Sequence, residues 1–230
     1  MGTMVAKMII TKKEMYLDIC DNPYKRELAR QIVNTYHTYV KFKDTPNRRI
    51  QWLIRNIDTD YIYGVIGINS ATLAIGVRDK YIGWDKTARL KNVVKVANNY
   101  RYCLMGGDNV SSSGVLSLLH TESRKVWKDK YGDNLVLLET YVEPPYDGHS
   151  YLAAGWVNIG MTKGFSIQKS PIDLWKRFDD KRGRLARKDP KKCLETYCPE
   201  GKQWRVQKST KKYILVKPLH RYWQKELRRY

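Results

Sequence analysis

The sequence predicts a mixed α/β fold, with antiparallel strand pairs early in the chain and a parallel pair in the middle. Three observations predict this fold. Hydrophobic residues make up 42% of the 230 residues, which is enough apolar material for a packed core. Two β-rich runs, 48–56 and 61–75, flank the turn-forming segment "IDTD". A strand, a helix and a buried-type strand follow one another over 93–142, an order typical of a parallel crossover.

The first predicted element is a helix within residues 21–40. Asp21 or Asn22 can cap its start, and Pro23 suits its first turn. Leu28, Ile32 and Val33 recur at helical spacing, so one face of this helix is expected to pack on the sheet. The helix is expected to end between Tyr36 and Tyr39.

The central elements alternate between strand and helix. The polar run "RDKYIGWDKTARLKN" is expected to be irregular or briefly helical. A strand is predicted over 93–105, and an amphipathic helix over 110–132 with Gly132 as its C-cap. The run "NLVLLETYV", 134–142, is apolar on both faces, which indicates a buried strand.

The last part of the chain is divided by composition. We expect a short helix over 149–155, a strand over 156–164, a strand over 211–219 and a basic amphipathic C-terminal helix. Segment 168–210 is basic, rich in turn formers and poorly periodic. We therefore predict a core over 1–167, a basic insertion over 168–210, and the last strand and helix of the core over 211–230.

Charge is the strongest compositional signal. The chain has 43 Lys and Arg against 23 Asp and Glu, a net charge of +20, and the surplus concentrates after residue 168. A positive charge of this size attracts polyanions, so DNA or RNA is the expected partner. The alternative explanation of the charge is general solubility or adaptation to a hot or salty cell. No apolar run spans a bilayer and no secretory signal is apparent, so we expect a cytoplasmic protein without a membrane partner.

The four cysteines, Cys20, Cys103, Cys193 and Cys198, are scattered, which favours reduced thiols over a disulfide framework. Cys193 and Cys198 are close together, but no second Cys or His pair has the spacing of a zinc site. The histidines are also spread out. Ligand spacing therefore predicts no metal site.

Several segments resemble known families. The order of elements over 93–156, ending in the step Gly155–Trp156, is similar to the acetyltransferase (GNAT) superfamily. The runs "DKYIGWDKTARLKNVVKVANNYRYCLM", "NVSSSGVLSLL", "KVWKDKYGDNLVLLETYVEP" and "SYLAAGWVNIGMTKG" resemble the family of the Druantia defence protein DruA. The same runs are similar to the Mom-type DNA-modification proteins of phages. The resemblance covers roughly residues 28–164, and "ILVKPLHRYW" resembles the end of the DruA-like domain.

The resemblance implies a GNAT-like mixed sheet flanked by helices, with a basic insertion before the last strand. Mom-type proteins place a carbamoylmethyl group on adenine N6 in DNA and use iron, whereas DruA-type proteins act in anti-phage defence. We therefore expect a DNA base-modifying transferase of phage or mobile-element origin, with adenine N6 the favoured acceptor. One alternative is a DNA-binding defence component that modifies no base. The other is an ordinary acyl-CoA N-acetyltransferase.

The loop "GGDNVSSSGV" lies between a predicted strand and a helix N-terminus, where backbone N–H groups and the helix dipole attract anions. Acetyltransferases hold the pyrophosphate of coenzyme A there, so an acyl-CoA-like donor is implied. This loop lacks the usual glycine spacing. The alternative is a capped helix start, with Asn109 or Ser111 as N-cap. The residues expected to bind a donor are Asn109, Ser111, Ser112, Ser113 and Gly114.

Four residues are candidates for catalysis. His37 lies where a GNAT-like fold borders its acceptor pocket, and a neutral imidazole could accept a proton from an exocyclic amine. Tyr39 belongs to the same neighbourhood, which resembles that of Mom-type proteins. Glu139 lies inside an apolar strand and is expected to be a general base, a metal ligand or the ion-pair partner of an arginine such as Arg101. Tyr151 occupies the place of an acetyltransferase general acid. For each, a structural role is the alternative.

The basic insertion interleaves cations with Trp175, Phe178, Tyr197 and Trp204, a pattern typical of phosphate contacts combined with base stacking. An enzyme that modifies a base in a duplex must extrude that base, and this segment could clamp the strand. The alternative is a solvated basic appendage. The predicted nucleic-acid contacts are Arg101, Lys181, Arg182, Arg184, Arg187, Lys188, Lys191 and Lys192.

Overall fold

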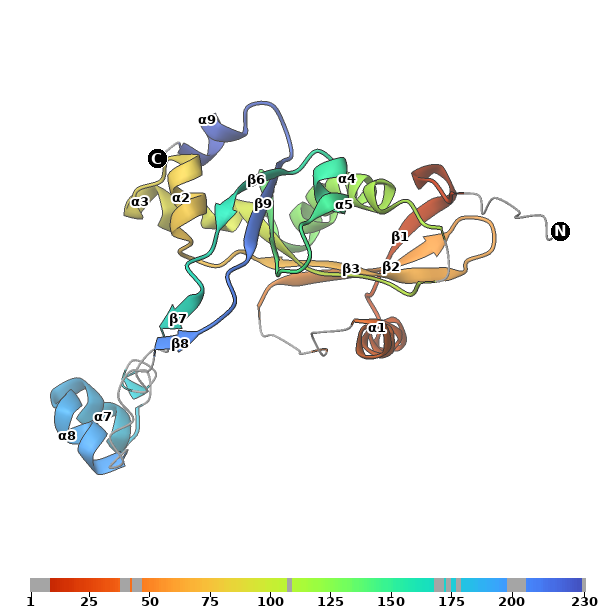
Figure 1. Ribbon diagram of the computed structural model, residues 1–230. Coiled ribbons are helices and arrows are strands. Elements are labelled where there is room, and N and C mark those ends of the chain that lie inside the picture. The colour runs from red at the N-terminus through yellow and green to blue at the C-terminus, as the bar shows by residue number, and fades with distance from the viewer. Residues whose placement is uncertain are drawn as a thin grey trace. The chain divides into compact units, whose positions relative to one another are not determined.

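The structure is a computed structural model that describes residues 9–37, 42, 47–106, 109–167, 172, 175–176, 179–197 and 206–228. The chain divides into two compact units: 1–161 together with 213–230, and 162–212. The first unit contains a seven-stranded sheet in the order β1-β2-β3-β4-β5-β9-β6, with helices on both faces (Figure 1). The predicted mixed α/β fold is confirmed.

The first strand, β1 (Met15–Ile19), was not predicted from the sequence. It pairs antiparallel with β2 (Arg49–Asn56), which forms a hairpin with β3 (Ile62–Ser70). The side chain of Asn56 accepts hydrogen bonds from two amides of the turn, and Asp60 adopts a positive φ of 58°. The predicted hairpin is therefore confirmed, with a third strand on its outer side.

Helix α1 (Pro23–Tyr36) covers one face of the sheet. The side chain of Asn22 caps it by accepting a hydrogen bond from the Lys25 amide, and Pro23 occupies the first turn as predicted. Its buried residues Ala29, Ile32 and Val33 pack against Leu53, Val65 and Cys103 of the sheet. The polar run after β3 forms two short helices, α2 (Gly76–Ile82) and α3 (Lys86–Asn92). This run is therefore more helical than the sequence indicated.

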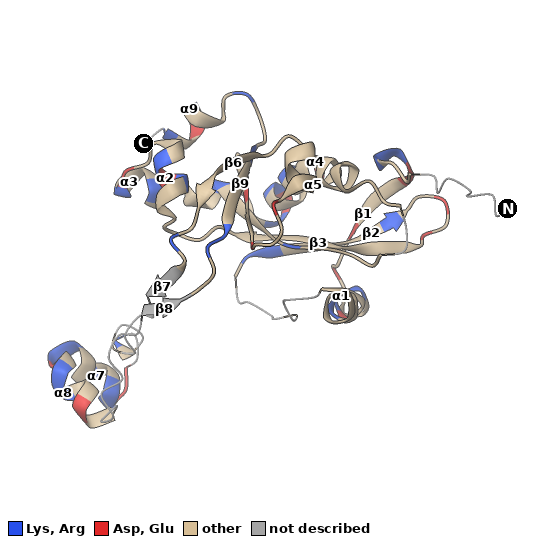
Figure 2. Cartoon of the chain, in the orientation of Figure 1, with Lys and Arg blue, Asp and Glu red and all other residues tan. Residues whose placement is uncertain are grey.

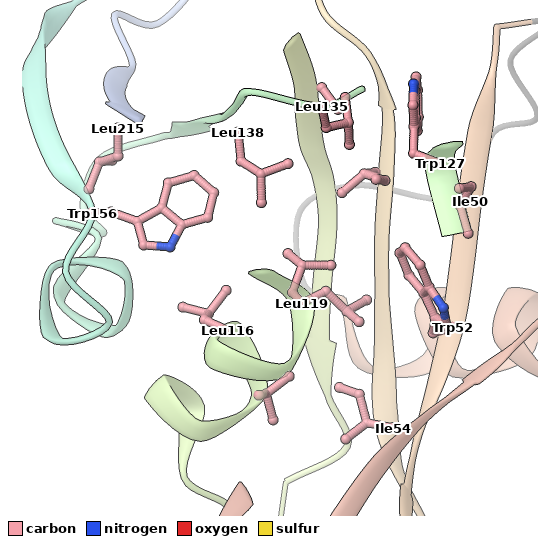
Figure 3. Close-up of a cluster of buried hydrophobic side chains, with 14 of the residues drawn as sticks. Ile50, Trp52, Ile54, Leu116, Leu119, Trp127, Leu135, Leu138, Trp156 and Leu215 are labelled. Atoms are coloured by element: carbon pink, nitrogen blue, oxygen red, sulfur yellow. The ribbon is translucent and has the colours of Figure 1, made fainter. Parts of the chain in front are cut away.

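The centre of the fold is the crossover from β4 (Val96–Leu104) through α4 (Ser112–Tyr131) to β5 (Leu137–Val142). The two strands are parallel, as predicted. Gly132 ends α4 in the left-handed region, with φ of 79°. On the face opposite α1, Leu116 and Leu119 of α4 pack with Trp52, Leu138 and Trp156 in the largest apolar cluster (Figure 3).

The remaining elements of the first unit are α5 (His149–Ala153), β6 (Val157–Met161), β9 (Tyr213–Pro218) and α9 (Trp223–Arg228). Strand β9 inserts between β5 and β6 and is antiparallel to both. The four corresponding predictions are confirmed in type and in position. None of the helices in the described part of the chain combines the length and apolar character needed to cross a bilayer.

The second unit contains β7 (Phe165–Ile167) paired with β8 (Val206–Lys208), and the helices α7 (Lys181–Lys188) and α8 (Pro190–Tyr197). Ile172, Ala186 and Cys193 form its small buried core. The sequence analysis described this stretch as poorly periodic and assigned 165–167 to the core of the chain. The structure adds two short helices to this stretch, and 165–167 is a strand of the second unit.

Candidate functional site

A cavity of about 560 Å³ lies where β4 and β5 separate. The two strands pair only from Val96–Leu137 to Asn98–Glu139, and beyond that point they diverge. The gap is lined by the end of α1, residues 99–104, residues 140–142 and residues 146–151. Its volume lies in the range of small-molecule sites, so the splayed strands provide room for a ligand the size of a nucleoside.

A β-bulge shapes one wall of this cavity. Gly67 stands opposite Arg101 and Asn69 opposite Asn98, so β4 has one residue more than β3 over this stretch. Bulges re-aim side chains next to functional sites. A Cβ atom on Gly67 would lie 3.0 Å from the Tyr100 ring, so glycine permits the ring to pack there.

His37 is the residue after α1 and lines the cavity. Its amide donates to the Val33 carbonyl oxygen at 3.0 Å, which fixes the backbone from which the half-buried imidazole projects. Burial, and secondarily the positive charge of Arg101, lower the pKa of His37 below its ordinary value of 6.5. The imidazole is therefore neutral at pH 7 and able to accept a proton.

Arg101 lies inside the cavity wall and not on the surface. It is only 4% exposed, and its guanidinium lies 5.6 Å from the Tyr100 ring centre and 6.0 Å from that of Phe42. The predicted role of Arg101, a contact with nucleic acid, stays a prediction. Arg101 can reach only a group that enters the cavity.

A hydrogen bond and ring contacts fix the position of the Tyr151 side chain. Its hydroxyl donates to Asn99 Oδ1 at 2.6 Å, while Asn99 Nδ2 donates to the carbonyl oxygens of Gly67 and Arg101. The ring packs edge-on against Trp156, with centroids 5.0 Å apart. Because its proton is directed at Asn99, the oxygen of Tyr151 is oriented to accept a hydrogen bond from a ligand.

Glu139 is fully buried and does not line the cavity. Its carboxylate accepts hydrogen bonds from Arg78 Nη1 at 3.0 Å and from the Tyr141 hydroxyl at 2.7 Å. Glu139 is therefore the ion-pair partner of an arginine, as one alternative predicted, but that arginine is Arg78 and not Arg101. Tyr141 does line the cavity, so Glu139 can influence the site only by holding Tyr141 in place.

Arg78 is the central residue of a buried polar network that the sequence did not reveal. Besides Glu139, its guanidinium donates to the carbonyl oxygens of Thr72 and Leu73 and to Asp79 Oδ1. Arg78 is 0% exposed, yet it has the partners that a buried cation requires. The network therefore ties α2 and the segment before it to β5 where the sheet splays.

Two amides at the start of α4, those of Ser111 and Gly114, are engaged within the protein and are not open to the pyrophosphate of a donor. The Ser111 amide donates to the Ile10 carbonyl oxygen at 2.9 Å, and the Gly114 amide donates to Ser111 Oγ at 3.1 Å. A Cβ atom on Gly114 would lie 3.2 Å from the Lys12 nitrogen, so the N-terminal segment covers this turn. The alternative interpretation, a helix start capped by Ser111, describes the observed geometry.

The other residues of this loop also face protein groups. Asn109 contributes its carbonyl oxygen to the Ile10 amide at 2.8 Å, and Ser112 contributes its carbonyl oxygen to the Tyr102 hydroxyl. Ser113 Oγ lies 3.4 Å from Ser111 Oγ. Of the five loop residues, Asn109, Ser111 and Gly114 lie against the N-terminal segment.

Among the described residues, no three His, Cys, Asp or Glu side chains converge to hold a metal ion. The residues present in that part of the chain therefore do not fit the iron implied by the resemblance. The described cysteines, Cys20, Cys103 and Cys193, are free thiols. Tyr39 and Cys198 lie outside the described residues.

Lys and Arg residues occur along α7 and in the first part of α8 of the second unit (Figure 2). Arg182 differs from the others, because its guanidinium lies between the rings of Trp175 and Tyr197, 5.4 and 5.5 Å from their centres. Arg182 therefore packs within the unit. The other six predicted contacts are exposed: Lys181, Arg184, Arg187, Lys188, Lys191 and Lys192.

The chain is similar to several solved structures of enzymes. It is similar to a spermidine N-acetyltransferase from Vibrio cholerae, with 6% identity, a TM-score of 0.45, and coverage of 90% of this chain and 96% of that one. It is also similar to FeeM, an N-acyl amino acid synthase from uncultured soil microbes, with 13% identity, a TM-score of 0.43, and coverage of 89% and 91%. No curated protein sequence matches the chain.

The sequence match to a protein family is more specific. The model of the family described as Druantia protein DruA matches residues 9–150, more than half of the chain. The match runs from the N-terminal segment that covers α4, through the strands that splay, to the start of the α5 wall. Most of the cavity lining lies within the matched residues, with Tyr151 one position beyond them, and the chain belongs to the DruA family.

Proposed function

We propose that this chain is a DNA-directed transferase that modifies a base held in the cavity between β4 and β5, with the exocyclic amine of adenine as the favoured acceptor. The observation that carries the proposal is the convergence of His37, Arg101 and Tyr151 on one cavity. A neutral base, a buried cation and an oriented phenol are the groups that transfer to an amine needs.

Charge supports DNA as the substrate. Residues 162–212 contain 16 Lys and Arg against 6 Asp and Glu, so this short segment carries half of the net charge. Exposed cations on α7 and α8 suit contacts with phosphates, which supply most non-specific affinity for DNA. A base must leave its stack to enter a cavity, and phosphate contacts can hold the strand while it does so.

The proposed chemistry follows from the positions of the three side chains. The amine nitrogen attacks the carbonyl carbon of an activated acyl donor, a new N–C bond forms, and the bond to the leaving group breaks. The imidazole of His37 accepts the proton that the amine loses. Arg101 stabilises the negative charge that develops on the carbonyl oxygen, and Tyr151 orients the amine by accepting a hydrogen bond. The donor is one that does not depend on pyrophosphate binding at α4.

Nucleoside mass spectrometry of DNA co-expressed with the chain tests the proposal. We expect a modified nucleoside with wild-type protein and about a hundredfold less with His37→Gln, which keeps a polar side chain but removes the proton acceptor. His149→Gln is the matched control, because His149 lines the same cavity but has no assigned role. Soluble wild-type protein with only unmodified nucleosides is the outcome that contradicts the proposal.

The pH dependence of the reaction is a second prediction. The pKa of His37 is lowered below 6.5, and only the neutral imidazole accepts a proton. The modification rate is therefore expected to be constant between pH 7 and 8 and to fall as the pH drops below 6.5. A pH–rate profile measured with purified protein and DNA checks this; a rate that rises on acidification would assign His37 a different role.

A second candidate function is a DNA-binding defence component that modifies no base. The occupied start of α4 favours it, because the usual donor site of an acetyltransferase is covered by the N-terminal segment. In that case His37→Gln leaves the biological effect intact, whereas charge reversal on α7 and α8 abolishes it. The same occupied turn argues against the third function, an ordinary acyl-CoA N-acetyltransferase. Tight binding of acetyl-CoA, measured by calorimetry, would support that function again.

A further inference from the structure

A second cavity, of about 730 Å³, opens where β1 ends and the chain turns into α1. Side chains of Cys20, Phe42, Arg49, Gln51 and Tyr131 contribute to its lining. The proposed function does not use this cavity, although it is larger than the first.

Gln51 is the distinctive residue of the second cavity. It is 7% exposed, and its Nε2 is buried without a hydrogen-bond partner among the described residues. Buried polar groups in native proteins are nearly always hydrogen-bonded, and an exception calls for an explanation. An acceptor on a bound ligand or an ordered water would satisfy this amide, and the cavity beside it has room for either.

Gln51 of the second cavity and Arg101 of the first share one face of the sheet, while the second cavity also reaches α4 on the other face. In the strand register Gln51 stands opposite Gly67, and Gly67 stands opposite Arg101, which lines the first cavity. Residues directly opposite one another share a face, and two strand spacings separate Gln51 from Arg101 by about 10 Å. Phe42 links the two sites, since it lines the second cavity and lies over Arg101.

The chemistry of the lining favours a nucleobase over a phosphate. Glutamine presents a donor and an acceptor side by side, the arrangement that reads base edges. The Phe42 ring offers a surface for stacking. Both signs of charge occur around the cavity, with four cations (Arg26, Arg30, Arg49 and Lys130) against three carboxylates (Asp21, Glu27 and Asp129), so the lining carries only a small positive surplus for an anion.

We propose that the second cavity binds the base adjacent to the one in the first cavity, and that Gln51 reads its edge. The proposal rests on the proposed function and adds the determinant of sequence context. It makes Gln51 a specificity-determining residue that takes no part in the reaction.

Photo-crosslinking locates the adjacent base without requiring modification activity. The probes are short single-stranded DNAs with 5-iodouracil placed beside an adenine, bound to the full-length protein, irradiated and mapped by peptide mass spectrometry. We expect crosslinks to peptides that contain Phe42 or Tyr131. Crosslinks confined to peptides of 162–212 overturn the proposal, even if nucleoside analysis confirms base modification.

Substitution of Gln51 tests the reading of the base. Gln51→Met keeps the length of the side chain and removes the buried amide, so the thermal midpoint is not expected to fall. The preference of the protein among oligonucleotides that differ beside the adenine should weaken about tenfold. Gln31→Met, on the exposed part of α1, is the matched control and leaves the preference unchanged. An unchanged preference in folded Gln51→Met overturns the proposal.

Discussion

Replacing Arg78 with methionine is expected to lower the free energy of unfolding by about 3–5 kcal/mol, because the variant leaves the carboxylate of Glu139 buried without its ion partner. Both side chains are 0% exposed, so water cannot replace the lost interaction. The variant also leaves the carbonyl oxygens of Thr72 and Leu73 without their donor. Urea denaturation followed by tryptophan fluorescence measures the loss.

The double variant Arg78→Met with Glu139→Leu is the control for this prediction. Replacing both members of a buried ion pair with apolar residues of similar size is often neutral or stabilising, so much of the loss should be recovered. Recovery is expected to be partial, because Asp79 also loses a hydrogen bond from Arg78. If Arg78→Met alone lies within about 1 kcal/mol of wild type, the network does not hold the splayed strands as we describe.

Reversing the charge of five exposed residues of the second unit is expected to lower the affinity for duplex DNA about a thousandfold at low salt. The substitutions are Lys181→Glu, Arg184→Glu, Lys188→Glu, Lys191→Glu and Lys192→Glu. Each lost phosphate contact also reduces the slope of log K against log salt by about 0.9. Fluorescence anisotropy with a labelled duplex over a series of salt concentrations measures both quantities.

A variant with five reversals elsewhere separates local contacts from total charge. Lys80, Lys86, Lys91, Lys125 and Lys128 of the first unit are also exposed, and changing all five to Glu alters the net charge by the same amount. We expect this control to weaken binding much less and to keep the salt slope. Equal losses in the two variants would show that net charge, and not the α7–α8 surface, governs binding.

The predictable parts of the fold are those whose signals are local. Asn22 and Gly132 mark the ends of α1 and α4 because caps and left-handed glycines are properties of neighbouring residues. Strand β1 has five residues, of which Met15 is the only one classed as buried, so its pairing with β2 depends on a distant partner. Helices α7 and α8 have eight residues each, too few for a clear helical period among so many lysines.

The contacts of the candidate site also depend on residues that are distant in the sequence. The sequence indicated that Glu139 needs a partner, but Arg78 lies 61 positions earlier and only the tertiary structure brings the two together. His37 and Tyr151 were each proposed from their place in the chain, and their common cavity depends on where β4 and β5 separate. The role of Ser111 could not be decided from the sequence, because the segment that covers it precedes it by a hundred residues.

The central claim is that a base leaves the duplex and enters the first cavity. The fluorescence of 2-aminopurine increases when this base analogue leaves the stack, so a duplex that contains it reports base extrusion directly. We expect a large increase when wild-type protein binds a duplex with 2-aminopurine in place of the target adenine. Ser150→Trp, which fills the cavity from α5, should keep the affinity for DNA and abolish the increase. Saturating binding of wild-type protein with unchanged fluorescence would contradict the account.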